Sequence, residues 1–523
     1  MGHIELVLLG VLVAVVALVV LALVLDVPYP IALVVGGAAL GFVPGAPHVA
    51  LPPNLVLIIM LPPLLYSAAF FSSLRDLQRN LRPISLLAVG AVLLTMLAVA
   101  FVAHHVVGLS SGVSFALGAI VAPTDAVAAT AIAARVGAPR RFVVIVEGES
   151  LINDSTALIA YAFAVEAAVT GTFSLSHALL TFVVNASAGV AIGLAVGFVV
   201  AQIRGRIEDV QAESMLSLVT PYLAYLPAEA LHVSAVLSAV TAGIYLGWRS
   251  PHIITPETRL QLFAIWRLLQ FLLNAALFAL LGLQLPLVFD RLGGETPAQL
   301  VGWAAAVVGA VLVARMIAVY ATAYVPRALS RRLRERDPYP PGAHPFVIGW
   351  SGMRGAVSLA AALALPLTFP DRGLVVYLTY AVIFATLVVQ GLSLPWLIHR
   401  LHLDGDESLT RKESKARLKA AEAAIARLDE LAGEDWVRDE TAERMRALYD
   451  YRRRRFAARF ADDGGAESDG IEQRSQSYQR LVREVLEAQR RQIVELRDEG
   501  RINDETMHRI ERDLDLEDLR LEQ

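Results

Sequence analysis

The feature that most constrains this fold is a series of long apolar segments, which recur until about Leu401 and then stop. A run of roughly 20 apolar residues crosses a membrane as a helix, because a helix satisfies its own backbone hydrogen bonds in lipid. About thirteen such segments are expected, and Pro or Gly interrupts several of them. They lie near residues 6–25, 30–44, 54–71, 83–104, 112–134, 142–168, 175–202, 213–230, 233–248, 260–288, 298–325, 345–368 and 373–400. The chain is therefore predicted to be an all-α polytopic membrane protein.

Arginine residues follow every odd-numbered segment from the third onward, whereas the intervening loops contain almost none. The arginine-rich loops include Arg75, Arg135 and Arg327. Because basic residues gather in cytoplasmic loops, these loops are expected to face the cytoplasm. The N-terminus is then outside and the C-terminus inside.

The composition changes at about Leu403, after which charged residues dominate. We therefore predict a transmembrane domain of residues 1–402 and a cytoplasmic helical tail of residues 403–523, in which Leu481, Leu486 and Ile493 recur at roughly helical spacing. Arg452–Arg455 are expected to form a solvated helix face, with contact to anionic membrane lipid as the alternative. The net charge of -4 suggests no nucleic acid partner, and the absence of cysteine excludes disulfides and cysteine-based metal sites.

Several carboxylates interrupt an otherwise apolar stretch from Val121 to Ala157. A charged carboxylate inside a membrane-spanning segment costs free energy, so such residues usually face a water-filled cavity or an ion path. Ser150 and Asp154 are four residues apart, so they share one helix face, and Asp154 is expected roughly 18 Å from the cytoplasmic edge, near the bilayer centre. A hydroxyl and a carboxylate are hard oxygen ligands, which suit Na⁺ or Li⁺. The stretch therefore indicates a protein that moves a cation or a proton.

Two of the apolar segments are expected to be broken helices. Pro123 disfavours helix next to Thr124 and Asp125 in the fifth segment, and three glycines surround Arg354 in the twelfth. Broken helices at corresponding positions point to a binding site between two inverted repeats. A buried arginine needs a partner, and Glu149 is the preferred partner of Arg354.

Five motifs carry a resemblance to a known family: LPPLLY (61–66), APTDA (122–126), EGESLIND (147–154), FLLNAALFALLGLQLP (271–286) and GMRGAVSLA (352–360). In this order, over residues 6–402, they resemble bacterial NhaP-type sodium/proton antiporters of the monovalent cation:proton antiporter-1 family. The resemblance implies exchange of Na⁺ or Li⁺ for H⁺ across the bacterial plasma membrane. It also implies a homodimer, in which an ion-transport core subdomain moves against a dimerisation subdomain in an elevator-like step. The tail is then a regulatory domain.

The resemblance also implies a role for each polar residue of the motifs. Asp154 is the ion-carrying carboxylate, and Asp125, Ser150 and the backbone of Thr124 help to hold the Na⁺. A second group of residues braces the site: Asn153, Glu149 and Arg354. Asn rather than Asp at position 153 matches the electroneutral branch of the family, which exchanges one Na⁺ for one proton.

Other functions remain open at this stage. A K⁺/H⁺ antiporter of the same family is the main alternative. A channel predicts polar residues along several helices rather than one compact cluster. The GWSG sequence at 349–352 fits an intramembrane serine protease, but the nearest downstream base, His399, lies at a segment end. We therefore expect a transporter rather than an enzyme, with no cofactor besides the transported ions. Arg315, deep in the eleventh segment, is a second candidate partner for a buried acid.

Overall fold

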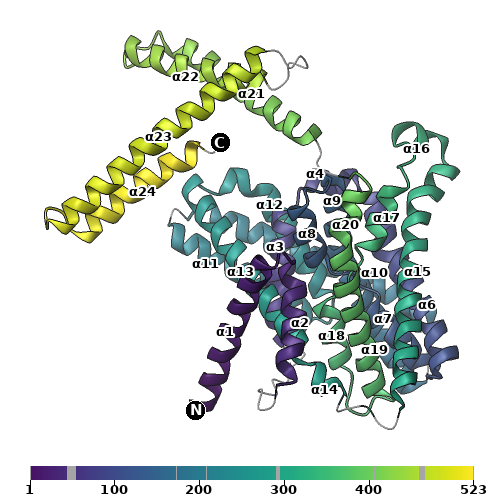
Figure 1. Cartoon of the computed structure of the whole chain (residues 1–523). Helices are drawn as coiled ribbons and strands as arrows, with labels where there is room; N and C mark the ends of the chain where they lie inside the picture. The colour runs from purple at the N-terminus through teal and green to yellow at the C-terminus, as the bar shows by residue number, and fades with distance from the viewer. Residues whose placement is uncertain are drawn as a thin grey trace. The chain divides into compact units, whose positions relative to one another are not determined.

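The computed structural model describes residues 2–43, 55–171, 174–207, 209–289, 292, 295–403, 407–458 and 466–521. Every regular element in these ranges is a helix, which confirms the predicted all-α fold class (Figure 1). Contacts divide the chain into two compact units, residues 1–405 and 406–523. The division falls close to the predicted boundary, whereas the roles assigned to the two domains stay predictions.

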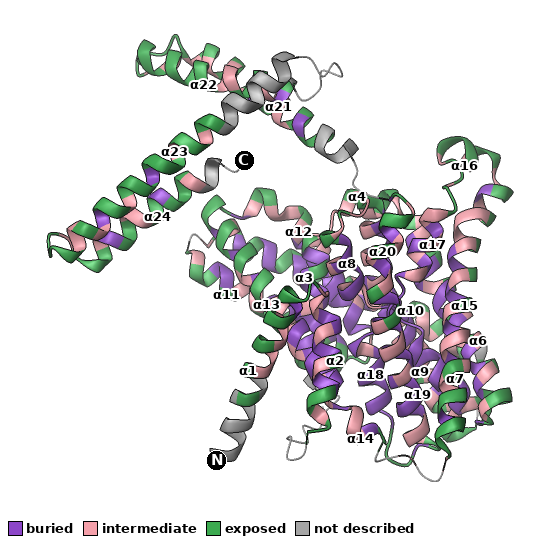
Figure 2. Cartoon of the chain, viewed as in Figure 1, coloured by how far each residue is buried: buried purple, intermediate pink, exposed green. Residues whose placement is uncertain are grey.

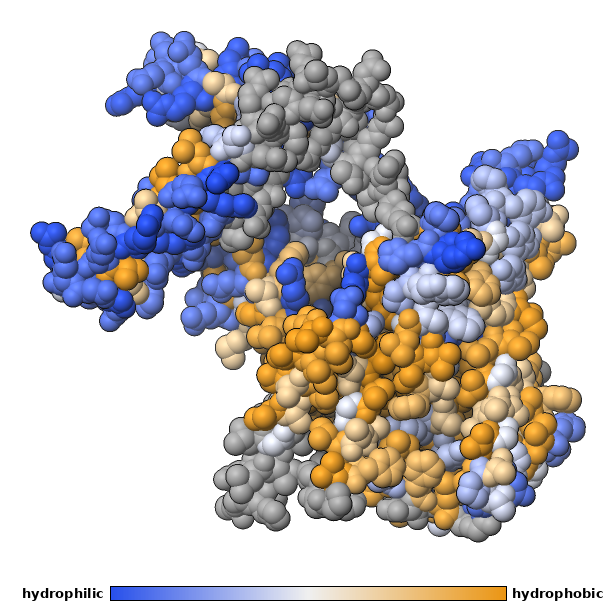
Figure 3. Space-filling model, viewed as in Figure 1, coloured by the Kyte–Doolittle hydropathy of each residue, from blue (hydrophilic) through white to orange (hydrophobic). Residues whose placement is uncertain are grey.

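Six stretches of the described chain are helical, long and apolar enough to cross a membrane: 81–107, 111–135, 176–204, 256–283, 297–329 and 372–400. Three shorter apolar helices cover 13–24, 29–41 and 56–71. Apolar side chains cover most of the face of the unit of residues 1–405 that Figure 3 shows, and hydrophilic side chains gather at the end of this face that carries α4 (Leu74–Arg79) and α16 (Arg331–Arg336). The exact count of thirteen spans and the inverted repeats stay predictions.

One group of helices, which we call the scaffold bundle, is held together by very close approaches. Gly243 and Gly247 allow α12 to lie against α3, since a Cβ on Gly243 would come within 2.6 Å of the Tyr66 carbonyl oxygen. Helix α13 packs along α2 in the same way, and α12 also packs along α10. The bundle consists of α1 (Gly2–Val24), α2 (Tyr29–Gly41), α3 (Leu61–Phe71), α10 (Leu175–Arg204), α11 (Val210–Ala230), α12 (Ala235–Ile253) and α13 (Pro256–Leu283).

We call the second group of helices the core bundle. Its buried residues lie together around α8, α9 and α18 (Figure 2). Helices α7 and α15 pack against α6, and α19 packs against both α15 and α18, so these helices form one connected group. The bundle consists of α5 (Leu81–Ser85), α6 (Val92–Val102), α7 (Ser111–Val121), α8 (Ala126–Arg135), α9 (Arg140–Thr170), α15 (Pro297–Leu329), α17 (Ala343–Trp350), α18 (Ala356–Leu363), α19 (Arg372–Ala385) and α20 (Gly391–Arg400). Short π-helical turns join some of these helices, and α14 (Leu285–Phe289) links the two bundles.

The two predicted helix breaks are confirmed. Helix α7 ends at Val121 and α8 begins at Ala126, whereas α17 ends at Trp350 and α18 begins at Ala356. Both breaks lie inside the core bundle and close to the scaffold, because α18 packs against α13 and α9 packs against α3 and α12. The hydroxyls of Ser155 and Ser234, 2.6 Å apart, form one polar link between α9 and the start of α12. The backbone groups that the breaks release from helical hydrogen bonds therefore lie within the protein interior.

The unit of residues 406–523 contains four helices: α21 (Glu407–Leu431), α22 (Asp439–Ala458), α23 (Ala466–Asp498) and α24 (Asp504–Leu521). Helices α23 and α24 form a hairpin whose apolar seam buries Leu486, Ile493, Met507 and Leu514. Of the three residues predicted from helical spacing, Leu486 and Ile493 lie in this seam, whereas Leu481 is 63% exposed. The arginines at 452–454 are exposed, as expected for a solvated helix face.

Candidate ion-binding site

The two helix breaks meet at a backbone hydrogen bond. The N–H of Asp125 donates to the carbonyl oxygen of Met353 over 2.8 Å. Asp125 also caps α8, since its Oδ1 accepts a hydrogen bond of 2.8 Å from the N–H of Val127. Gly355 lies directly on the carboxylate of Asp125, so closely that a Cβ at this position would overlap it. The two interrupted segments therefore hold the Asp125 carboxylate in one orientation.

A cavity opens beside this crossing and brings the predicted ion ligands together. Asp125, Thr124, Ser150 and Asp154 all line it, and with its mouth it encloses about 750 Å³. Ser150 and Asp154 lie one turn apart on α9 and face the cavity together, as their spacing predicted. Asp154 is only 6% exposed. In the described part of the chain, neither Asp125 nor Asp154 forms a salt bridge.

A polar network behind the cavity fixes the backbone of the first break. The side-chain amide of Asn153 donates to Thr124 Oγ1 over 2.8 Å and to the Thr124 carbonyl oxygen over 3.4 Å. Thr124 Oγ1 in turn donates to Glu149 Oε1 over 3.4 Å. Asn153 is fully buried and does not line the cavity, so its contacts position Thr124 rather than an ion.

The predicted ion pair between Glu149 and Arg354 is wrong, because Glu149 pairs with Arg315 of α15. Arg315 makes a two-pronged contact in which Nη1 meets Oε1, and Nη2 donates to Oε2 over 2.7 Å. Both side chains are almost completely buried. A guanidinium fork matches a carboxylate in this geometry, which strengthens the pair and fixes the orientation of both groups.

Arg354 binds backbone instead of a carboxylate. Its Nε donates to the carbonyl oxygen of Val121 over 3.1 Å, and its Nη1 donates to the carbonyl oxygen of Gly352. Val121 is the last residue of α7, and helix ends leave carbonyls without partners inside the helix. Arg354 therefore joins the two breaks. The sequence placed it correctly at the second break and assigned it the wrong partner.

Two further cavity residues were missed by the sequence analysis. Ser358 of α18 and Asn274 of α13 both line the cavity. Ser358 is 1% exposed, and its hydroxyl has no hydrogen-bond partner among the described residues. Ser358 follows Arg354 by one helical turn, which is a usable signal, but its orientation depends on how α18 packs. Asn274 comes from the scaffold bundle, so no spacing within the core motifs could indicate it.

Comparison with known proteins finds sodium/proton exchangers and antiporters among the relatives of this chain. The family described as sodium/hydrogen exchanger, transmembrane, matches residues 11–400. An uncharacterised Na⁺/H⁺ exchanger of Mycobacterium tuberculosis is 34% identical over 98% of this chain and 96% of its own length. The Na⁺/H⁺ antiporter ApNhaP of Aphanothece halophytica is 33% identical over 77% of this chain and 76% of its own.

A relative with a broader ion range is also found. The sodium, potassium, lithium and rubidium/H⁺ antiporter of Bacillus subtilis is 30% identical over 71% of this chain and 58% of its own length. Among solved structures, the sodium proton antiporter MjNhaP1 of Methanocaldococcus jannaschii superposes with a TM-score of 0.59. That match has 19% sequence identity and covers 76% of this chain and 97% of the other, so it supports the fold.

Proposed function

The chain belongs to the sodium/hydrogen exchanger family, and on that premise we propose that it is a secondary transporter that exchanges Na⁺ for H⁺ at the cavity beside the two helix breaks. The observation that carries this proposal is the pair Asp125 and Asp154, two carboxylates that line one cavity without an ion-pair partner in the described residues. Ser150 and the backbone of Thr124 add neutral oxygen ligands, which suit a hard monovalent cation.

Exchange follows from competition for the same oxygen atoms. A Na⁺ ion in the cavity favours the charged form of Asp154, and a proton on Asp154 removes the charge that attracts Na⁺. Each ion therefore expels the other, and an empty cavity in which Asp125 and Asp154 are both charged is disfavoured because like charges repel. Alternating exposure of this one site to the two sides of the membrane then couples inward movement of one ion to outward movement of the other.

We assign a ratio of one Na⁺ to one proton. Asn153 is neutral and is committed to Thr124, so Asp154 has no third carboxylate beside it on this turn of α9. Asp125 is held by the N–H of Val127 and by the crossing, which supports a fixed ligand rather than a second proton carrier. The site then carries the same net charge with Na⁺ bound as with a proton bound.

The division into two bundles supports an elevator-like movement. The four predicted ligands of the ion lie in the core bundle, whereas the scaffold contributes Asn274 to the cavity wall. Sliding of the core along the scaffold would carry the ion with its ligands from one side to the other. We further propose a homodimer in the bacterial plasma membrane, with the arginine-rich loops and the tail in the cytoplasm.

Reconstituted protein tests this proposal directly. The full chain is placed in liposomes with an internal pH dye, a pH gradient is set, and Na⁺, Li⁺ or K⁺ is added outside. Na⁺-driven proton movement without net current supports antiport, and absence of coupled movement with any of the three cations contradicts it. K⁺/H⁺ exchange is the second candidate, because the Bacillus subtilis relative is named for K⁺ as well as Na⁺; equal rates with K⁺ would favour it.

A further inference from the structure

A second cavity lies in the core bundle at its arginine-rich end, apart from the ion site. With its open mouth it encloses about 760 Å³. Its walls come from five places in the core bundle: the start of α5, the start of α9, the end of α15, α17 and the region around α20. The walls are mostly apolar and include Leu87, Phe142, Ile145, Val319 and Ile398. None of the described residues lines both this cavity and the ion cavity.

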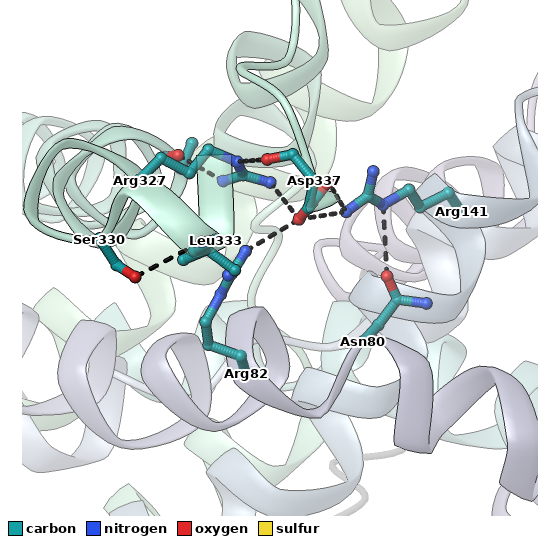
Figure 4. Close-up of polar contacts among 8 residues, drawn as sticks. Asn80, Arg82, Arg141, Arg327, Ser330, Leu333 and Asp337 are labelled. Carbon is teal, nitrogen blue, oxygen red and sulfur yellow. Dashed lines mark hydrogen bonds and ion pairs between the residues drawn. The ribbon is translucent and has the colours of Figure 1, made fainter. Parts of the chain in front are cut away.

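Three arginines converge on one carboxylate at this end of the core bundle, and two of them line the cavity (Figure 4). Asp337 accepts from Arg327 over 2.6 Å, from Arg82 over 2.9 Å and from Arg141 over 3.3 Å. The arginines come from α15, α5 and α9, so the cluster ties three helices together. Arg141 also donates to Asn80 Oδ1 over 3.2 Å, as Figure 4 shows.

The cluster carries more positive than negative charge. Three guanidinium groups and one carboxylate give three minus one, a net charge of +2. Asp76 pairs with the neighbouring Arg140 over 2.8 Å, so its negative charge does not offset the positive charge of the cluster. Arg141 remains about half exposed, with its side chain 53% accessible. An apolar cavity under a cationic rim is complementary to a molecule with one anionic and one aliphatic end.

We propose that this arginine-rimmed cavity binds an anionic glycerophospholipid, with part of an acyl chain against Leu87, Phe142 and Ile145. Its phosphate would lie at Arg141, which lines the cavity, and at Arg82, which does not line it but shares Asp337 with Arg141. Basic pockets between membrane helices on the cytoplasmic side are suited to anionic head groups, and the arginine-rich loops belong to that side by the positive-inside rule. Guanidinium and phosphate groups form charge-assisted, often two-pronged hydrogen bonds. Asp337 holds the arginines in place before the lipid arrives.

The position of the lipid gives it a route to the transport site. It would contact α9 and α15, which carry Glu149 and Arg315 of the buried ion pair. It would also contact α17, which leads into the second helix break. A bound lipid would therefore stabilise the core bundle as one body, and the thermal stability of the protein should depend on the lipid head group.

The test uses the full chain in a neutral detergent, with dioctanoyl phosphatidylglycerol as the probe. Lipid binding is measured by native mass spectrometry, and the melting temperature is measured in parallel. Arg82→Gln and Arg141→Gln should each weaken binding about fivefold, because a basic residue near an anionic lipid contributes about 1 kcal/mol. Asp337→Asn should strengthen binding about fivefold, since it raises the net charge of the cluster, while it lowers the melting temperature in the absence of lipid. A purely structural cluster gives no such gain.

Three control variants separate lipid binding at this cavity from a general effect of surface charge. Arg141→Lys keeps the charge and should retain most of the binding, and Arg331→Gln, which removes an exposed arginine paired with Glu335, should leave binding unchanged. Thr322→Phe narrows the cavity without altering charge and should weaken binding. Four results would each overturn the proposal. The first two are equal binding of dioctanoyl phosphatidylcholine and competition by inorganic phosphate at equal concentration. The other two are binding seen only after removal of residues 407–523 and unchanged binding in Thr322→Phe.

Discussion

The backbone N–H of Asp125 donates a hydrogen bond to the carbonyl oxygen of Met353, and this contact is where the two interrupted helices cross. Neither group could make this bond inside a continuous helix, where each would be bonded within its own chain segment. Because Arg354 also binds the last carbonyl of α7, the two breaks stabilise each other. The ion cavity therefore depends on both segments at once.

Gly355→Ala should abolish exchange while the protein still inserts in the membrane. A Cβ at position 355 would overlap the carboxylate of Asp125, which cannot move without losing its hydrogen bond to Val127. Sodium-driven proton flux in liposomes measures the effect. Gly302→Ala is the matched control, because no atom lies within 4 Å of a Cβ at that position. Wild-type flux in Gly355→Ala would mean that Asp125 does not occupy this position during transport.

Arg315→Ala should lower the melting temperature more than Arg354→Ala. Removing Arg315 leaves Glu149 charged and buried, which costs about 3–5 kcal/mol. Removing Arg354 leaves carbonyl groups without one donor, which costs about 1–3 kcal/mol. The double variant Arg315→Gln with Glu149→Gln should recover part of the loss, since no charge is then left uncompensated. Arg331→Ala, at an exposed pair, serves as control and should change stability by about 0–1 kcal/mol. The opposite order of the two melting temperatures would argue against the Glu149–Arg315 pair.

Asp154→Asn should abolish exchange without unfolding the protein, because the amide cannot be titrated and carries no charge for Na⁺. Asn153→Asp should instead introduce a further charge beside the site, so any remaining turnover should become dependent on membrane voltage, although the variant loses the amide that donates to Thr124. Proton flux is compared with and without a potential clamped by valinomycin. A voltage response already present in the wild-type protein would contradict one-for-one exchange.

Ser358→Ala should raise the KM for Na⁺ about fivefold with little change in kcat. The hydroxyl lines the cavity without a hydrogen-bond partner in the described structure, so its loss removes an oxygen worth about 1 kcal/mol to a bound ion. Ser358→Thr keeps the hydroxyl and should behave like the wild type. Initial rates over a range of Na⁺ concentrations give both constants. An unchanged KM in Ser358→Ala would exclude Ser358 from the ion site.

The stability of the protein should fall at acidic pH through Asp337. Burial alone would raise the pKa of Asp337, but Arg141 and Arg327 outweigh burial and hold this pKa below its usual value. A group with a lowered pKa contributes stability above its unfolded value of about 3.9, and the contribution is lost as the pH falls through the folded pKa. The melting temperature should therefore drop below about pH 4. Asp337→Asn should show a smaller drop over the same range.

Much of the ion site could be predicted because it depends on local geometry. Pro123 interrupts its helix by its own covalent structure, and a spacing of four residues places Ser150 and Asp154 on one face whatever surrounds α9. The helix break beside Arg354 was likewise predictable from the glycines around it. These features need only the chain within one or two turns, and the structure places them as the sequence predicted.

The partners of the buried charges were decided by the tertiary structure. Arg315 and Arg354 are both deep arginines in apolar segments, and no local rule says which one reaches Glu149. The choice depends on how α15 and α17 rotate and slide when their apolar faces pack against α9, which is set by many small contacts far apart in sequence. The sequence by itself therefore determined the helices, their breaks and the carboxylates of the site. The packing of the helices decided that Arg354 binds the breaks, that Ser358 and Asn274 line the cavity, and that three arginines meet at Asp337.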